Sequence, residues 1–209
     1  MDYPTRHSLV LQGLRFTSRQ VALISTFIAI GAVVRIGVDQ IGDMVPGTAF
    51  AVVIKLGLSE TLSFVSGFVY GPIAGFVTGF LIIVLSDIGT PYGAGAWTPF
   101  IASIIGLLGI CGGYIRRLRQ RPTALMMIIS AIGLTLLSET LQNLYVSFAY
   151  GVPIIASIVS GLPSLVSALT NNIIFFPTIG LKVIEFIQEH HLNGVQNELG
   201  PKNKEMVTS

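Results

Sequence analysis

The chain has 209 residues, of which 52% are hydrophobic and only 11% are charged, and its mean hydropathy is +0.77. Soluble domains carry roughly 25% charged residues, so the composition excludes a protein with an ordinary water-facing surface. The net charge of +2 is too small to indicate nucleic-acid binding, and the single Cys111 excludes a disulfide framework. Several apolar runs approach the roughly 20 residues of a spanning helix, which predicts an all-α integral membrane protein.

The first half of the chain should contain one clear helix and one overlong apolar run. A cytoplasmic segment at 1–19 precedes a helix at 20–38, which is retained because no small-residue cleavage pattern follows it. An acidic loop is expected at 39–46. The weakly charged run at 46–85 has Gly71-Pro72 near its middle, and proline disfavours helical geometry at the preceding residue. This dipeptide is therefore a candidate break between two helices.

The second half begins with a turn-rich segment whose Gly and Pro content prevents a continuous helix. Three helices should follow it, and a polar, flexible tail should end the chain. The ranges are 86–99 for the turn-rich segment, 100–114, 124–150 and 155–186 for the helices, and 188–209 for the cytoplasmic tail. A single transmembrane domain at 20–187 is expected.

The positions of Lys and Arg predict the number of crossings. Basic residues gather before the first helix, at 116–121 and near the end of the chain. The remaining loops, which contain neither Lys nor Arg, are 39–46, 86–99 and 151–154. Because basic residues accumulate on the cytoplasmic side, the run at 46–85 must cross twice, with its break at Gly71-Pro72 inside. The prediction is a six-transmembrane-helix bundle with cytoplasmic N- and C-termini.

Ionisable groups at membrane depth are costly, so they are candidate ligand contacts. Arg35 could anchor a ligand carboxylate or phosphate, or it could snorkel to the interface and pair with Asp39. Lys55 and Glu60 could pair with each other or contact a ligand. These alternatives remain open at the level of the sequence.

The turn-rich segment combines an acid with two aromatics, Asp87, Tyr92 and Trp97. Aromatic residues are ordinary at the membrane interface, where they form a belt. On a Gly-rich loop they could equally stack on a flat heterocycle as a lid. The segment is a candidate part of a ligand site.

Polar side chains also occur within the helices at 124–150 and 155–186. The first of these helices carries Thr135 and Ser138, and its Glu139, Gln142 and Asn143 share one face, either as a packing network or as part of a binding cavity. The following helix carries a small-polar stripe that favours close packing and ends at bulkier amides: Ser157, Ser160, Ser164, Ser167, Asn171 and Asn172. Of these, the two asparagines are the better candidates for ligand contacts.

Several chemistries are not expected. The histidines His7, His190 and His191 lie in terminal segments, which argues against an intramembrane Ser-His hydrolase or a His-ligated metal centre. The sequence contains no Gly-x-x-x-x-Gly-Lys-Ser/Thr phosphate loop, so ATP hydrolysis by that motif is excluded. The prediction is a protein that is not an enzyme and has no cofactor or metal.

Three motifs carry a resemblance to a known family. They are Gly-Phe-Val-Tyr-Gly-Pro-Ile-Ala-Gly at 67–75, Trp97-Thr-Pro before a Gly-rich helix, and Gly-Gly-Tyr-Ile-Arg-Arg at 112–117. With six short helices over about 19–187, the chain resembles the substrate-binding S component of energy-coupling factor (ECF) transporters.

The resemblance implies a prokaryotic plasma-membrane protein that captures a vitamin or related micronutrient from outside. Such a subunit works with a transmembrane T component and two cytoplasmic ATPase subunits. The family contacts its T component through Ala-x-x-x-Ala on the first helix, and Ser25-x-x-x-Ala29 is the nearest match here. Flanked by Ala22 and Ala32, it makes a small-residue face that permits close helix approach.

The sequence therefore predicts a micronutrient-binding S component. The mixture of charged and aromatic groups suits a polar heterocyclic ligand. The candidate substrate-binding residues are Arg35, Lys55, Glu60, Asp87, Tyr92, Trp97, Glu139, Gln142, Asn143 and Asn171. Two alternatives are a non-transporting membrane scaffold or assembly protein, in which the polar faces only join helices, and a solitary secondary carrier.

Overall fold

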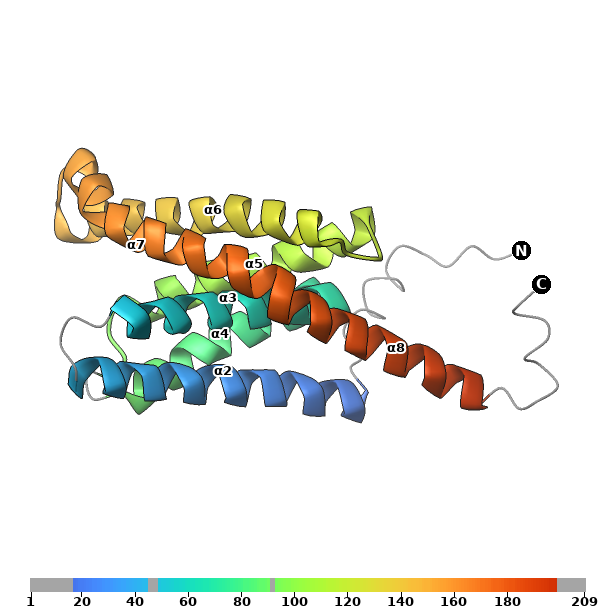
Figure 1. Cartoon of the computed structure of the whole chain (residues 1–209). Helices are drawn as coiled ribbons and strands as arrows, with labels where there is room; N and C mark the ends of the chain where they lie inside the picture. The colour runs from blue at the N-terminus through green and yellow to red at the C-terminus, as the bar shows by residue number, and fades with distance from the viewer. Residues whose placement is uncertain (1–16, 45–48, 91–92, 199–209) are drawn as a thin grey trace, which may run out of the picture.

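The computed structural model describes residues 17–44, 49–90 and 93–198, with side chains at 39, 41–44, 49–56 and 190–198 left out of the description. Across these residues the chain is helical and contains no strand (Figure 1). The helices are α2 (Ser18–Met44), α3 (Ala49–Tyr70), α4 (Pro72–Gly89), α5 (Thr98–Leu118), α6 (Ala124–Tyr150) and α7 (Ile154–Phe175). A π-helical turn, η1 (Phe176–Gly180), joins α7 to α8 (Leu181–Glu198) without a break. This turn contains Pro177, which cannot donate an intrahelical hydrogen bond.

Five helical segments of the described chain are long and apolar enough to cross a membrane. They are Ser18–Val38, Pro72–Gly89, Thr98–Leu118, Ala124–Tyr150 and Ile154–Glu189. Large apolar side chains on their outer surfaces are exposed, as at Phe148, which is 86% exposed. An apolar exterior of this kind suits contact with lipid rather than water. The chain is an all-helical, multi-pass membrane protein.

The predicted break at Gly71-Pro72 is confirmed. α3 ends at Tyr70 and α4 begins at Pro72, which occupies the first turn where proline is tolerated. Gly71 between them has φ 104°, in the region that favours glycine because it has no Cβ. The bounds of α6 also agree with the predicted helix at 124–150.

Other helices are longer than predicted. α2 continues through most of the expected acidic loop to Met44. The strongest helix-breaking residue before Pro46 is Gly42, and a single glycine does not end the helix. α5 extends beyond 100–114 at both ends, with proline in its first turn. At the other end of the chain, where the flexible tail was expected from residue 188, α8 continues to Glu198. The apolar spans themselves end close to the predicted positions, at Val38 and Glu189.

α3 lies at the centre of the bundle, where it packs against α2, α4, α5 and α7. In Figure 1, α2 runs along one side and α6 along the other, and the rod formed by α7 and α8 crosses the bundle diagonally. α6 packs mainly on α7. This arrangement brings the polar faces of α3, α6 and α7 together.

Hydrogen bonds identify which connections share an end of the bundle. Arg116, at the end of α5, donates to the Val69 carbonyl beside the α3–α4 turn. Gln188 of α8 donates to the Gln120 carbonyl at 3.1 Å. The Gly71 turn, the basic segment at 116–121 and α8 therefore lie at one end, in agreement with the charge pattern.

α3, α4 and α5 approach so closely that their backbones touch. A Cβ added at Gly67 or Gly75 would overlap the Gly109 carbonyl, and a Cβ at Gly109 would overlap the backbone of Gly75. Ser63 lies in the same contact and can donate to the Gly75 carbonyl at 3.2 Å or the Ile105 carbonyl at 2.8 Å. Small residues allow this packing, on which helix association in lipid depends.

We predict that Gly109→Ala destabilises the bundle by about 1–3 kcal/mol, because the added methyl group forces α4 and α5 apart. Gly133→Ala is the matched control, since its added Cβ meets no other part of the described chain within 4 Å beyond its own neighbours and local helix backbone, and alanine favours the helix by up to about 1 kcal/mol. The free energy of unfolding in detergent, measured by titration with a denaturing detergent, separates the two variants. Equal stabilities would contradict the packing argument.

Candidate functional site

Buried polar residues gather where α3, α6 and α7 meet. We refer to these residues as the interior polar cluster: Glu60, Thr135, Ser138, Glu139, Ser164, Asn171 and Asn172. All except the partly buried Ser164 are almost inaccessible. A carboxylate or amide in such a place needs hydrogen-bond partners, because burial without them costs free energy.

Glu60 of α3 is held by residues from two other helices. The Asn172 side-chain amide of α7 donates to Glu60 Oε2 and also to Thr135 Oγ1, the latter at 2.8 Å. Ser138 Oγ of α6 donates to Glu60 Oε1 at 3.5 Å and to the Thr135 carbonyl at 3.1 Å. These bonds fix α3, α6 and α7 relative to one another.

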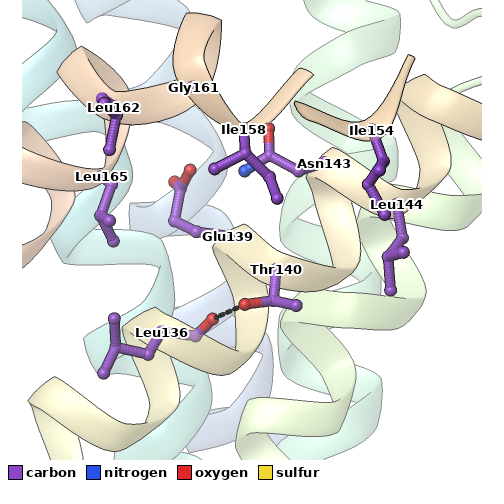
Figure 2. Close-up of a pocket in the computed structure, with 10 residues that line it drawn as sticks. All are labelled: Leu136, Glu139, Thr140, Asn143, Leu144, Ile154, Ile158, Gly161, Leu162 and Leu165. Carbon is purple, nitrogen blue, oxygen red and sulfur yellow. Dashed lines mark hydrogen bonds between the residues drawn. The ribbon is translucent and has the colours of Figure 1, made fainter. Parts of the chain in front are cut away.

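Glu139 lies next to Ser138 but turns to the interface between α6 and α7. Its Oε1 accepts a hydrogen bond from Ser164 Oγ at 3.2 Å. Figure 2 shows Glu139 and Asn143 pointing from α6 toward α7, into a cavity of about 150 Å³. The rest of the lining is mainly aliphatic, and Thr140 uses its hydroxyl to donate to the Leu136 carbonyl at 2.7 Å.

Two amides of the cluster have buried atoms without a hydrogen-bond partner among the described residues. Asn171 is 1% exposed, and neither its Nδ2 nor its Oδ1 has a partner within the described chain. The same is true of Asn172 Oδ1. Asn171 packs against Gly57 of α3, where a Cβ would overlap the asparagine. Since each unsatisfied buried group costs about 1–3 kcal/mol, the pattern favours a place that a ligand or water completes.

A second polar group joins α2, α4 and α5. Arg35 Nη2 pairs with Asp87 Oδ1 at 3.5 Å, and Asp87 Oδ2 accepts from Thr98 Oγ1 at 2.7 Å. The two charged side chains are about nine-tenths buried. Asp87 was expected in the turn-rich segment but lies in the last turn of α4. Arg35 thus has a counter-ion that the sequence did not identify, whereas the side chain of Asp39 lies outside the described residues.

Two of the remaining predicted site residues, Trp97 and Gln142, lie outside the interior polar cluster. Trp97 is 38% exposed at the start of α5, and its ring lies against Gly95. Gln142 is half-buried on α6. The side chain of Lys55 and the whole of Tyr92 lie outside the described residues. The predicted lid and the Lys55–Glu60 pair therefore stay predictions.

The structure adds Thr135, Ser138 and Ser164 to the predicted site residues, and it brings in Asn172, which the sequence favoured as a contact together with Asn171. Their helical spacing placed most of them on polar faces, but nothing local indicated that Glu60 of α3 would meet them. Among the described residues, no group of His, Cys, Asp and Glu side chains has the arrangement of a metal site.

The predicted partner-binding face on α2 is partly corrected. Ala22, Ser25 and Ala29 are exposed, as that prediction requires. Ala32 is only 5% exposed and belongs to the core, because α2 approaches α4 at this level and Gly31 meets Ile82. The available small-residue face therefore ends at Ala29.

We predict that Asn172→Leu lowers the free energy of unfolding by about 1.5–3 kcal/mol, because it removes a hydrogen bond to the Glu60 carboxylate. Asn171→Leu should cost much less or stabilise the protein, since its amide has no partner among the described residues to lose. Thermal unfolding of both variants in the same detergent tests the contrast. A larger loss for Asn171→Leu would contradict the described network.

Comparison with family models, with curated proteins and with solved structures found no match for this chain.

Proposed function

We propose that this chain is the substrate-capture subunit of an ECF-type importer. It binds a vitamin or related micronutrient from outside and passes it inward with a T component and two ATPase subunits. The proposal places six crossings in a prokaryotic plasma membrane, with both termini in the cytoplasm. It rests on the motif resemblance and on the interior polar cluster.

The observation that carries a binding function is the set of unsatisfied amides inside an apolar bundle. A scaffold would be most stable with an interior whose polar groups are all hydrogen-bonded. A polar network that is only partly hydrogen-bonded is less stable even than apolar packing. Here Asn171 and Asn172 have hydrogen-bonding atoms that no described residue satisfies, and Asn172 also bonds the buried carboxyl group of Glu60. A cavity lined by Glu139, another member of the cluster, lies between α6 and α7. These features favour a ligand site over a purely structural network.

The proposed orientation follows from the end of the bundle that carries positive charge. The basic segment at 116–121 and the Gly71 turn lie at the same end of the bundle. Because basic residues accumulate on the cytoplasmic side, this end is proposed to face the cytoplasm. The Arg35–Asp87 pair lies near the opposite end of α4. Ligand entry would then occur from the end where α6 meets α7 through Gly151.

Dependence on partner chains is supported by two further features. The sequence lacks a P-loop motif, so energy from ATP would have to come from other subunits. The exposed Ala22, Ser25 and Ala29 leave a shallow face on α2, against which another helix could pack closely.

We predict that one member of a panel of vitamins and their precursors stabilises the purified protein. A ligand at a hundredfold excess over its dissociation constant should add about 2.7 kcal/mol to the free energy of unfolding. Thermal-shift measurements on the full chain in detergent detect this effect. If no compound in the panel raises the midpoint, the scaffold alternative is supported instead.

We predict that Ala29→Leu abolishes co-purification with a co-expressed T component and its ATPases, because the larger side chain prevents close helix contact. Ala149→Leu is the matched control, since it makes the same change at an exposed position on α6. Both variants should unfold at the wild-type temperature. Substrate uptake that persists in cells lacking the T component and ATPases would favour a solitary carrier and overturn the proposal.

A further inference from the structure

The cavity between α6 and α7 combines aliphatic walls with a carboxylate. Leu136, Ile158, Leu162 and Leu165 form much of its lining, and Glu139 and Asn143 supply its polar atoms. Its volume of about 150 Å³ is comparable to that of an apolar cavity that holds a benzene ring. The space therefore suits a ring-sized apolar body with a polar substituent.

Glu139 brings a carboxyl group to the wall of this cavity. Its side chain is 6% exposed, and its described hydrogen bond comes from the uncharged Ser164. Among the described side chains, which do not include that of Lys55, Glu139 has no ion-pair partner, and Arg35 pairs with Asp87. A cationic ligand would therefore supply a counter-charge that these described residues do not.

Gly161 of α7 keeps the cavity open beside Asn143. A Cβ at this position would overlap the Asn143 side chain, whose Oδ1 accepts from Ser157 Oγ at 3.5 Å. Asn143 is thus held one turn away from Glu139 along α6. The carboxylate and the amide can contact two different parts of one small molecule.

We propose that the cavity binds a small organic cation whose positive group lies at Glu139 and whose apolar body packs between α6 and α7. This deepens the proposed function, since it rests on taking the same site as the ligand site. A ligand anion would be disfavoured beside the Glu139 carboxyl group, whereas a cation would give the ionised carboxylate a counter-ion. An inorganic cation would lose its hydration shell against the aliphatic walls, whereas an organic cation can place its apolar body against them.

The test uses three probes that share one ring and differ in charge: benzylammonium, benzyl alcohol and benzoate. Binding is measured by calorimetry on the full chain in nanodiscs of zwitterionic lipid, which avoids competition from anionic headgroups. Benzylammonium should bind and the other two should not. Glu139→Gln should weaken benzylammonium binding by about ten- to a hundredfold, the effect of losing one charged contact.

Glu185→Gln is the matched control, because it removes the same charge from an exposed position on α8 and should leave benzylammonium binding unchanged. If Glu139→Gln fails to fold, Leu162→Trp supplies a second test. Leu162 lines the cavity and is 47% exposed, so tryptophan should block the space without disturbing the core. Loss of benzylammonium binding in this variant is the expected result.

The assignment is overturned if benzylammonium does not bind, if benzyl alcohol or benzoate binds as tightly, or if Glu139→Gln binds it normally. These outcomes are separate from those that test transport. Stabilisation by a neutral or anionic micronutrient, without benzylammonium binding, would refute the charge preference and leave the importer proposal standing. Selective benzylammonium binding by a chain that has no associated ATPase module would support the charge preference and refute the importer proposal.

Discussion

The rest of the structure depends on the backbone contact between α3, α4 and α5. Lipid tails are as apolar as leucine side chains, so helices in a bilayer gain little from hydrophobic burial against one another. Close approach at Gly67, Gly75 and Gly109 supplies dispersion contacts instead, and Ser63 adds a hydrogen bond within the same interface. This contact holds α3 at the centre of the bundle. Glu60 therefore meets α6 and α7 rather than lipid.

The distribution of polar groups reverses that of a soluble protein. Apolar side chains such as Phe148 cover the outside, and carboxylates and amides occupy the inside. Asn172 and Ser138 supply donors to Glu60, which offsets part of the cost of its burial. Of the buried side-chain atoms without a partner in the described chain, three belong to Asn171 and Asn172 of α7. Under the proposed function, a ligand would complete their hydrogen bonds.

The two polar groups of the bundle differ in charge balance. Asp87 compensates Arg35 in the group that joins α2, α4 and α5. Glu60 and Glu139 have hydroxyl or amide donors in the described chain and no ion-pair partner there. The mixed set of charges that the sequence presents as one candidate site is therefore divided in space. The cavity is lined by Glu139 and therefore belongs to the part that contains the two glutamates.

The sequence by itself determined the membrane class, the break at Gly71 and the bounds of α6, because hydropathy, glycine and proline act locally. Helical periodicity also indicated the polar faces of α6 and α7. Only the tertiary structure decided that Arg35 pairs with Asp87, that Glu60 meets Asn172, and that Ala32 is buried. Periodicity shows which side chains share a face, but the partner of that face depends on how helices distant in sequence cross.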